Sequence, residues 1–333
     1  MTTWEIVKAV LLFLFGFVCL IKGGDWFVDG ASGIAKRLKI PEIIIGATVV
    51  SIGTTLPEVM VSSSAALKGA GEIAYGNALG SIICNTSLIA ALTIAVRPAK
   101  IERSSLYLPV FFFFGAMIFY ALNAYLFGRF GRIAGIILLL IFCAYTALVI
   151  TTQLRKRKKG LADPVVQEPE EEKQKPTPLW KEIVFLIIGA ALIALGANLL
   201  VDNGTILAKV AGVPESVIAL TFVALGTSLP ELVTAITSLA KGHSVLSLGN
   251  IIGANLFNLV LVSGLSTTLS PYTIPMEKTL FGINASLIVD IPLCFAVMAI
   301  LTVPALLKKK VMRWQGIALL VIYAAYLVFQ FAL

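Results

Sequence analysis

Long runs of apolar residues dominate this 333-residue chain, and they constrain its fold more than any other feature. A helix that crosses a bilayer needs roughly 20 mostly apolar residues. Ten segments meet that requirement, at about 5–27, 41–67, 73–95, 106–127, 131–152, 180–206, 214–240, 245–269, 280–303 and 312–332. Only 13% of the residues are charged, where soluble domains have about 25%. The sequence therefore predicts an all-α membrane protein with ten transmembrane helices.

The one long polar stretch lies near the middle of the chain, at 153–179. It begins with a basic run at 155–159 and continues with prolines and glutamates. Polar, proline-rich segments of this kind act as linkers. We therefore expect a first five-helix repeat at 1–152, a linker at 153–179 and a second five-helix repeat at 180–333.

The two halves resemble each other at a constant offset of 173 residues. The segment Gly53-Thr-Thr-Leu-Pro-Glu58 corresponds to Gly226-Thr-Ser-Leu-Pro-Glu231, and Gly76-Asn77 corresponds to Gly249-Asn250. Most of the shared residues are Gly, Pro, Glu, Asn and Thr, so a common membrane composition does not explain them. Because each half has an odd number of spans, the second half is predicted to be inverted relative to the first. Inverted repeats are typical of transporters with a site near the bilayer midplane.

The basic residues predict the orientation in the membrane. Lys and Arg gather in the loops after the first, third, fifth, seventh and ninth spans, and such loops stay cytoplasmic. The net charge of +8 therefore indicates the orientation of the loops in the membrane and not nucleic-acid binding. We expect a multi-pass protein of the cell membrane with both termini outside, a cytoplasmic linker and a first apolar run retained as a helix.

The repeated segments each place a glutamate deep in an apolar run. Pro57 and Pro230 remove backbone donors and free the carbonyls of Gly53 and Gly226, which predicts a loosened turn in both halves. An intramembrane carboxylate is costly unless it is compensated, and no Lys or Arg lies in either motif. Glu58 and Glu231 are therefore predicted to be protonated or neutralised by bound cations.

The surrounding residue types predict an all-oxygen site. Hydroxyls accompany the glutamates on the same helix faces, and the central amides Asn85 and Asn258 repeat each other. One histidine and four scattered cysteines argue against a zinc or disulfide site. Oxygen ligands with two carboxylates suit one Ca²⁺ or two or more Na⁺. No cofactor, nucleic acid or protein partner is predicted, only the transported ions and the lipid bilayer.

Three other polar sets stay open at this stage. Asn77 and Asn250 are equally consistent with capping or packing of their helices and with a role in the site. Asp25 and Asp29 are expected near the cytoplasmic end of the first span, satisfied by Lys22 or lipid head groups. Asp290, in the ninth span, has no charged counterpart in the first repeat and stays unassigned.

At the paired motifs, the sequence resembles the cation/Ca²⁺ exchanger superfamily, and most of all its prokaryotic Na⁺/Ca²⁺ exchanger branch. The resemblance covers nearly the whole chain. It implies alternating access, with the first and sixth spans sliding across a core of the other eight. It also implies that Glu58 and Glu231 bind Ca²⁺ directly, together with backbone oxygens of Thr54 and Thr227. The implied Na⁺ sites use two sets of residues: Ala224, Thr227, Ser228, Ser81 and Glu58 in one, and Ser51, Thr54, Thr55, Glu231 and residue 254 in the other.

Two positions depart from the pattern of that family. Residue 254 is Ala where close archaeal relatives have Ser, which removes a hydroxyl from the second Na⁺ set. Residue 258 is Asn where some relatives have the Asp that is associated with the K⁺-dependent branch. The second departure argues against K⁺ co-transport.

Other functions remain possible from the sequence. The same fold could exchange Ca²⁺ for H⁺, with Glu58 and Glu231 carrying protons, and the loss of a hydroxyl at Ala254 favours this alternative. A passive cation channel is a second alternative. An enzyme is not expected, because no nucleophile–base pair or cofactor loop is present.

Overall fold

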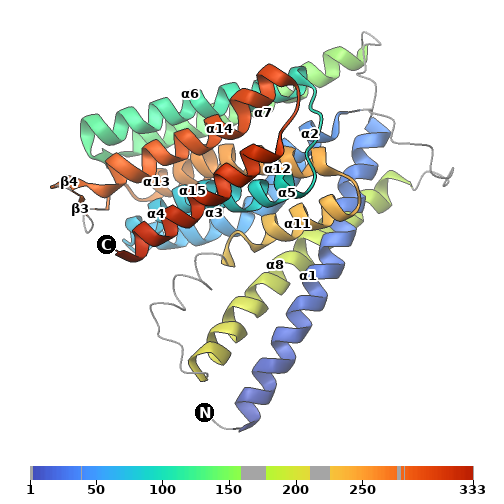
Figure 1. The fold of residues 1–333 in the computed structure, drawn as a ribbon, viewed down its shortest axis with the longest axis horizontal. Coiled ribbons are helices and arrows are strands. Elements are labelled where there is room, and N and C mark those ends of the chain that lie inside the picture. Colours follow the sequence, from blue (N-terminus) through green and yellow to red (C-terminus); the bar gives the residue numbers. More distant parts are fainter. Residues whose placement is uncertain are drawn as a thin grey trace.

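The computed structural model describes residues 3–38, 40–158, 178–210, 226–275, 279–280 and 282–332. This part of the chain is nearly all helical (Figure 1), and nine of its helices are long and apolar enough to cross a membrane. The seventh predicted span is described only from residue 226 onward, where it forms the 12-residue helix α11 (Leu229–Ala240). The predicted helical membrane fold is confirmed, and the count of ten spans in inverted repeats stays a prediction.

The first half is built from long helices, some with an internal change of helical turn. They are α1 (Thr3–Leu38), α2 (Glu42–Ile45), η1 (Gly46–Val50), α3 (Ser51–Leu67), α4 (Gly71–Cys84), η2 (Asn85–Ala90), α5 (Ala91–Val96), α6 (Arg103–Phe127) and α7 (Arg132–Lys158). The elements α2–η1–α3 form one apolar span, as do α4–η2–α5. The strand β1 (Arg129–Phe130) follows α6.

The second half has a similar succession over the described residues. Its helical elements are α8 (Leu179–Val210), α11, α12 (Ser244–Phe257), η4 (Asn258–Val262), α13 (Ser263–Leu269), η5 (Ser286–Asp290), α14 (Ile291–Lys308) and α15 (Arg313–Ala332). Its strands are β2 (Tyr272–Thr273), β3 (Thr279–Leu280) and β4 (Ile283–Asn284). Strand β1 pairs antiparallel with β2, and β3 pairs with β4. The β1–β2 pair and an isolated bridge between Lys100 and Lys310 flank opposite ends of α6.

Wide π-helical turns interrupt several spans. The turns η2 and η4 begin at Asn85 and Asn258, which are repeat-related positions. The turns η1 and η5 lie in the second and ninth predicted spans. Such turns are rare and often mark functional sites. The structure therefore places a matched irregularity at both central asparagines.

Helices α1 and α8 lie side by side and extend away from the other helices (Figure 1). Their backbones approach closely through glycines. A Cβ atom on Gly23 would lie 2.9 Å from the Gly189 carbonyl oxygen, and one on Gly196 would lie 2.7 Å from that of Gly16. Because small residues let membrane helices pack backbone to backbone, these two helices form one unit, here called the α1–α8 pair.

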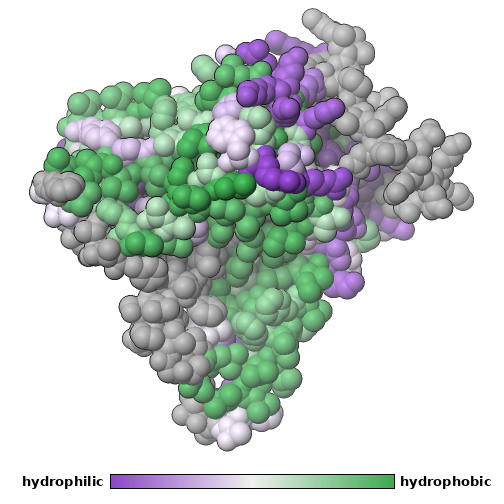
Figure 2. All heavy atoms as spheres, in the orientation of Figure 1, coloured by the Kyte–Doolittle hydropathy of each residue, from purple (hydrophilic) through white to green (hydrophobic). Residues whose placement is uncertain are grey.

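A larger hydrophobic core lies among the remaining helices, from α4–α7 and α12–α15. The outer surface is also apolar, because many large hydrophobic side chains are exposed, among them Leu11, Phe111, Leu126, Ile133 and Val321. Hydrophobic residues cover much of the face in Figure 2, and hydrophilic ones gather toward its upper right, near the connection from α1 to α2. This distribution fits a surface that faces lipid with one polar end.

Candidate cation site

The two repeated motifs have different local structures. In the first half, α3 continues as a helix from Ser51 to Leu67 with Pro57 inside it. The loosened turn predicted at Gly53 is therefore wrong, and the irregular turn lies upstream at Gly46–Val50. In the second half, residues 226–228 precede α11, whose first turn holds Pro230 and Glu231. The interruption expected near Gly226 is confirmed, because Thr227 and Ser228 form a turn before α11 begins. Proline is well tolerated in the first turn of a helix.

Glu58 and Glu231 are both fully buried, with 0% of each residue exposed. None of their four carboxyl oxygens has a hydrogen-bond partner within the described residues. The two carboxylates are close enough to repel each other, and no described Lys or Arg pairs with either. Two adjacent buried acids without a cationic side chain need a bound cation or protons. Their environment therefore fits a transported cation.

Other buried polar groups lie on the same spans as the two acids and on the spans that follow them. Asn85 and Asn258 are each 0% exposed, and neither amide group has a described partner. Ser81 and Ser228 lie together, with their hydroxyl oxygens 3.5 Å apart. The Thr55 hydroxyl is buried and also lacks a described partner. Unsatisfied buried oxygens are the groups that a cation would complete.

The second expected Na⁺ set lies against helix α12. The Ser51 hydroxyl donates to the backbone carbonyls of Gly46 (2.6 Å) and Asn250 (2.9 Å). Thr54 lies beside the Glu231 carboxyl and is 2% exposed. Ala254 is fully buried in α12. Ala224 falls outside the described residues.

Three residues that sequence reasoning did not assign also belong to these surroundings. Asn77 and Asn250 contact the motif threonines, and they are not caps, because α4 begins at Gly71 and α12 at Ser244. The Cys84 thiol lies near Ser228 and both glutamates. The doubled Gly-Asn motif was a signal for the asparagines, whereas nothing in the sequence distinguished Cys84 from the other cysteines.

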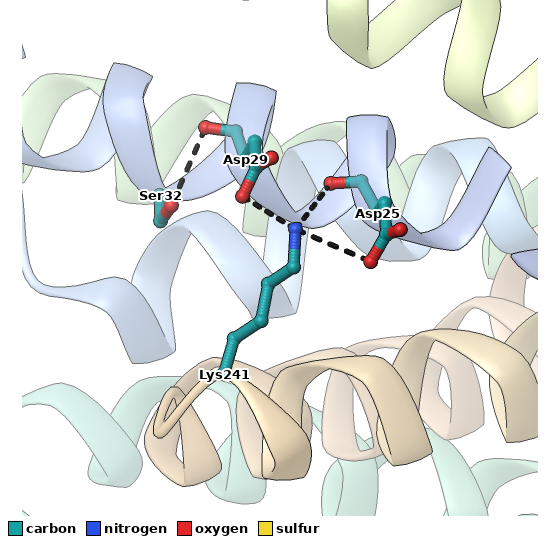
Figure 3. Close-up of polar contacts among 4 residues, drawn as sticks. All are labelled: Asp25, Asp29, Ser32 and Lys241. Atoms are coloured by element: carbon teal, nitrogen blue, oxygen red, sulfur yellow. Dashed lines mark hydrogen bonds and ion pairs between the residues drawn. The ribbon is translucent and has the colours of Figure 1, made fainter. Parts of the chain in front are cut away.

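An ion-pair cluster joins α1 to the end of α11 (Figure 3). The Lys241 ammonium lies 2.7 Å from Asp29 Oδ1 and 3.4 Å from Asp25 Oδ1, and it donates to the Asp25 carbonyl at 3.0 Å. Sequence analysis had expected Lys22 or lipid as the partner of these acids, and it missed Lys241. Two residues further on, His243 lies 2.9 Å from Glu42 at the start of α2. These contacts tie the α11–α12 connection to both α1 and α2.

Asp290 belongs to a separate cluster. Its carboxylate accepts hydrogen bonds from Ser286 (3.0 Å), Tyr326 (3.3 Å) and Gln330 (3.3 Å). These contacts join η5 to α15 and involve none of the residues predicted for the cation site. The structure thus gives Asp290 a local network of hydrogen bonds.

Comparison with known proteins identifies the kind of molecule. Residues 8–151 and 181–332 match the profile of the family described as "Sodium/calcium exchanger protein". The chain belongs to this family. It is therefore a membrane antiporter, since the sodium/calcium exchangers are transporters and not enzymes. The predicted superfamily and branch are confirmed.

Relatives from archaea and bacteria support this assignment. The chain is 30% identical to "Sodium/calcium exchanger MaX1" of Methanosarcina acetivorans, over 96% of this chain and 98% of that protein. It is 35% identical to "Putative antiporter CaxA" of Alkalimonas amylolytica, over 79% and 81% of the two chains. Its fold matches a solved structure of the sodium–calcium exchanger NCX_Mj soaked with 2.5 mM Na⁺ and 10 mM Sr²⁺. That match has a TM-score of 0.78 at 28% identity and covers 97% of this chain and 99% of the other.

Proposed function

We propose that this exchanger moves Ca²⁺ against Na⁺ by alternating access at a midplane site between two inverted five-helix repeats, with ten spans in all. The observation that carries the proposal is the pair of buried acids, Glu58 and Glu231, whose carboxyl oxygens lack described partners. Two negative charges are balanced by one Ca²⁺ or by two Na⁺, so either load can neutralise the same cavity. Competition for one cavity is what an exchange cycle requires.

The proposed ligands follow the oxygen groups around these acids. Ca²⁺ binds the carboxylates of Glu58 and Glu231 and backbone oxygens of Thr54 and Thr227, and Asn85 and Asn258 contribute amide dipoles at the centre. Na⁺ binds at the flanks, through Ser81, Ser228 and Ala224 on one side and Ser51 and Thr55 on the other, together with the same Glu and Thr residues. The contact between Ser81 and Ser228 supports the first flank. The second flank lacks a side-chain oxygen at Ala254.

The proposed orientation places both termini on the outer side of the membrane and the 153–179 linker in the cytoplasm. Residues 159–177 of this linker are not among the described residues. The basic residues near the Lys100–Lys310 bridge then lie at the cytoplasmic end of α6. The cluster of Lys241, Asp25 and Asp29 lies in the same half of the membrane. Positively charged loops favour that side.

The function is tested by ⁴⁵Ca²⁺ uptake into proteoliposomes. We expect ⁴⁵Ca²⁺ uptake when an outward Na⁺ gradient is present and no uptake when the gradient is absent. Uptake driven by a pH gradient alone would favour the Ca²⁺/H⁺ alternative, and Ca²⁺ flux without any counter-gradient would indicate a channel.

The site is tested by removing one charge at a time. Glu58→Gln and Glu231→Gln should each abolish exchange while the protein still inserts and elutes as a single species, because a neutral amide is easier to bury but cannot balance the cation. Glu72→Gln is a matched control, since Glu72 is exposed on α4. Wild-type exchange by either of the first two variants would exclude that glutamate from the site.

A further inference from the structure

Asn77 and Asn250 occupy equivalent positions in the two repeats and face the motif of the opposite repeat. Asn77 lies in the second turn of α4, and Asn250 lies in the second turn of α12. Asn250 is 1% exposed, whereas Asn77 is half-buried. Neither residue carries a charge, so neither is needed to balance the transported ion.

Each asparagine accepts a hydrogen bond from the motif threonine of the other repeat. Thr54 Oγ1 donates to Asn250 Oδ1 at 3.2 Å, and Thr227 Oγ1 donates to Asn77 Oδ1 at 3.1 Å. The two contacts are reciprocal, because both partners in one are offset by the same 173 residues from those in the other. Thr54 has two competing acceptors, the Ser51 carbonyl, which is more distant at 3.4 Å, and the Glu231 carboxyl beside it.

The amide nitrogen of each asparagine is linked, directly or through a hydroxyl, to the backbone carbonyl of the motif glutamate in its own repeat. Asn77 Nδ2 donates to the Glu58 carbonyl at 3.3 Å and to the Ser62 hydroxyl at 2.8 Å. Asn250 Nδ2 donates to the Thr234 hydroxyl at 3.3 Å, and that hydroxyl reaches the Glu231 carbonyl at 3.1 Å. These donors fix which end of the amide faces the threonine. Each asparagine thus links the threonine of one repeat to the glutamate of the other.

The direction of the threonine bonds has a chemical consequence. A hydroxyl has one proton to donate and two lone pairs that can accept. When the proton points at an asparagine oxygen, the lone pairs remain free for a cation. Without that acceptor, the threonine hydroxyl would turn its proton toward its own helix or toward a glutamate, and its lone pairs would leave the cavity.

We propose that Asn77 and Asn250 are positioning residues, each of which orients the motif threonine hydroxyl of the opposite repeat so that its lone pairs face a bound Na⁺. The inference rests on the proposed function, since it assumes that Thr54 and Thr227 lie at the cation site. It adds a role for two residues that need not touch the ion.

The test is a set of double-mutant cycles in which the pairing itself supplies the controls. Asn250→Ala and Asn77→Ala are combined with Thr54→Ala and Thr227→Ala, giving two matched and two mismatched pairs. The readouts are the Na⁺ concentration that gives half-maximal ⁴⁵Ca²⁺ exchange and the maximal rate. Na⁺ binding to the purified variants, measured by its effect on the unfolding temperature, supplies the same cycle without turnover.

Each asparagine variant should raise the half-saturating ion concentration about two- to tenfold, the effect of one net hydrogen bond. The maximal rate should change less. In the matched pairs, Asn250 with Thr54 and Asn77 with Thr227, the double variant should be no worse than the threonine variant alone. In the mismatched pairs, the two effects should multiply.

Equal coupling in matched and mismatched pairs, or independent effects in all four, would overturn the proposal. If an alanine variant does not fold, serine replaces the asparagine, because its hydroxyl is too short to reach the threonine and the same results are expected. Absence of Na⁺-driven Ca²⁺ exchange in the wild type would instead refute the proposed function. The two failures are therefore distinguishable.

Discussion

Replacing Gly23 by alanine tests whether α1 and α8 form one unit. A Cβ atom at this position would lie 2.8 Å from the Ile193 backbone nitrogen and 2.9 Å from both the Gly189 carbonyl oxygen and the Leu192 Cβ atom. All three atoms belong to the α8 backbone or are attached directly to it, so a side-chain rotation cannot relieve the contact. The two helices must separate, or the substitution must strain them.

The expected cost follows from these contacts. Overpacking of a filled interior costs about 1–3 kcal/mol, and backbone obstruction on three sides places Gly23→Ala in the upper part of that range. Alanine also favours a helix over glycine by about 1 kcal/mol. The net destabilisation should therefore be about 1–2 kcal/mol, with a lower midpoint of thermal unfolding in detergent.

Two other glycines serve as controls. Gly115 lies in α6, and a Cβ atom there would meet nothing within 4 Å, so Gly115→Ala should match or exceed the wild-type stability. Gly24 faces α11, where the obstructing atoms are the Thr237 and Val233 side chains. Because those side chains can shift, Gly24→Ala should cost less than Gly23→Ala. Equal stability of Gly23→Ala and Gly115→Ala would refute the close packing of the pair.

Three further predictions concern other parts of the chain. Ala254→Ser should lower the Na⁺ concentration for half-maximal Ca²⁺ flux roughly fivefold, the equivalent of about 1 kcal/mol; an unchanged midpoint with normal expression would argue against a ligand at this position. Lys241→Met should change the free energy of unfolding by no more than about 1 kcal/mol, because its ion pairs are partly exposed. It should nevertheless speed hydrogen exchange of the α1 amides around Asp25 and Asp29, and unchanged exchange would show that the ion pairs do not hold α1. Removing about ten residues from 160–178, which fall outside the described part except at the end, should leave transport intact, as measured by the same flux assay.

The sequence allowed the membrane fold and the central acids to be predicted, because both leave a local signature. Apolar runs of spanning length define the helices. The two central glutamates stand out from other acidic residues because Glu58 recurs as Glu231 in the second repeat. Contacts between distant segments leave no such signature. The bond from Thr227 to Asn77 and the ion pair of Lys241 with Asp29 depend on how helices from different repeats come together.

Local helix geometry was the weaker part of the prediction. The same motif is continuous helix around Pro57 but begins a helix at Pro230. Proline removes one hydrogen bond in either setting, so its presence alone does not determine where a membrane helix is interrupted. The surroundings of the motif differ between the repeats, since Asn77 contacts Ser62 in the first and Asn250 contacts Thr234 in the second.

The glycine contacts between α1 and α8 have a mechanical consequence. Each helix comes from a different half of the chain, yet their backbones are too close for one to shift far without the other. The two helices are therefore expected to move as one body. In the proposed alternating-access cycle, a tilt of this body would open an aqueous path on one face of the membrane as it closes the path on the opposite face. In that cycle, protection against an ion leak would follow from the linkage of α1 to α8 itself.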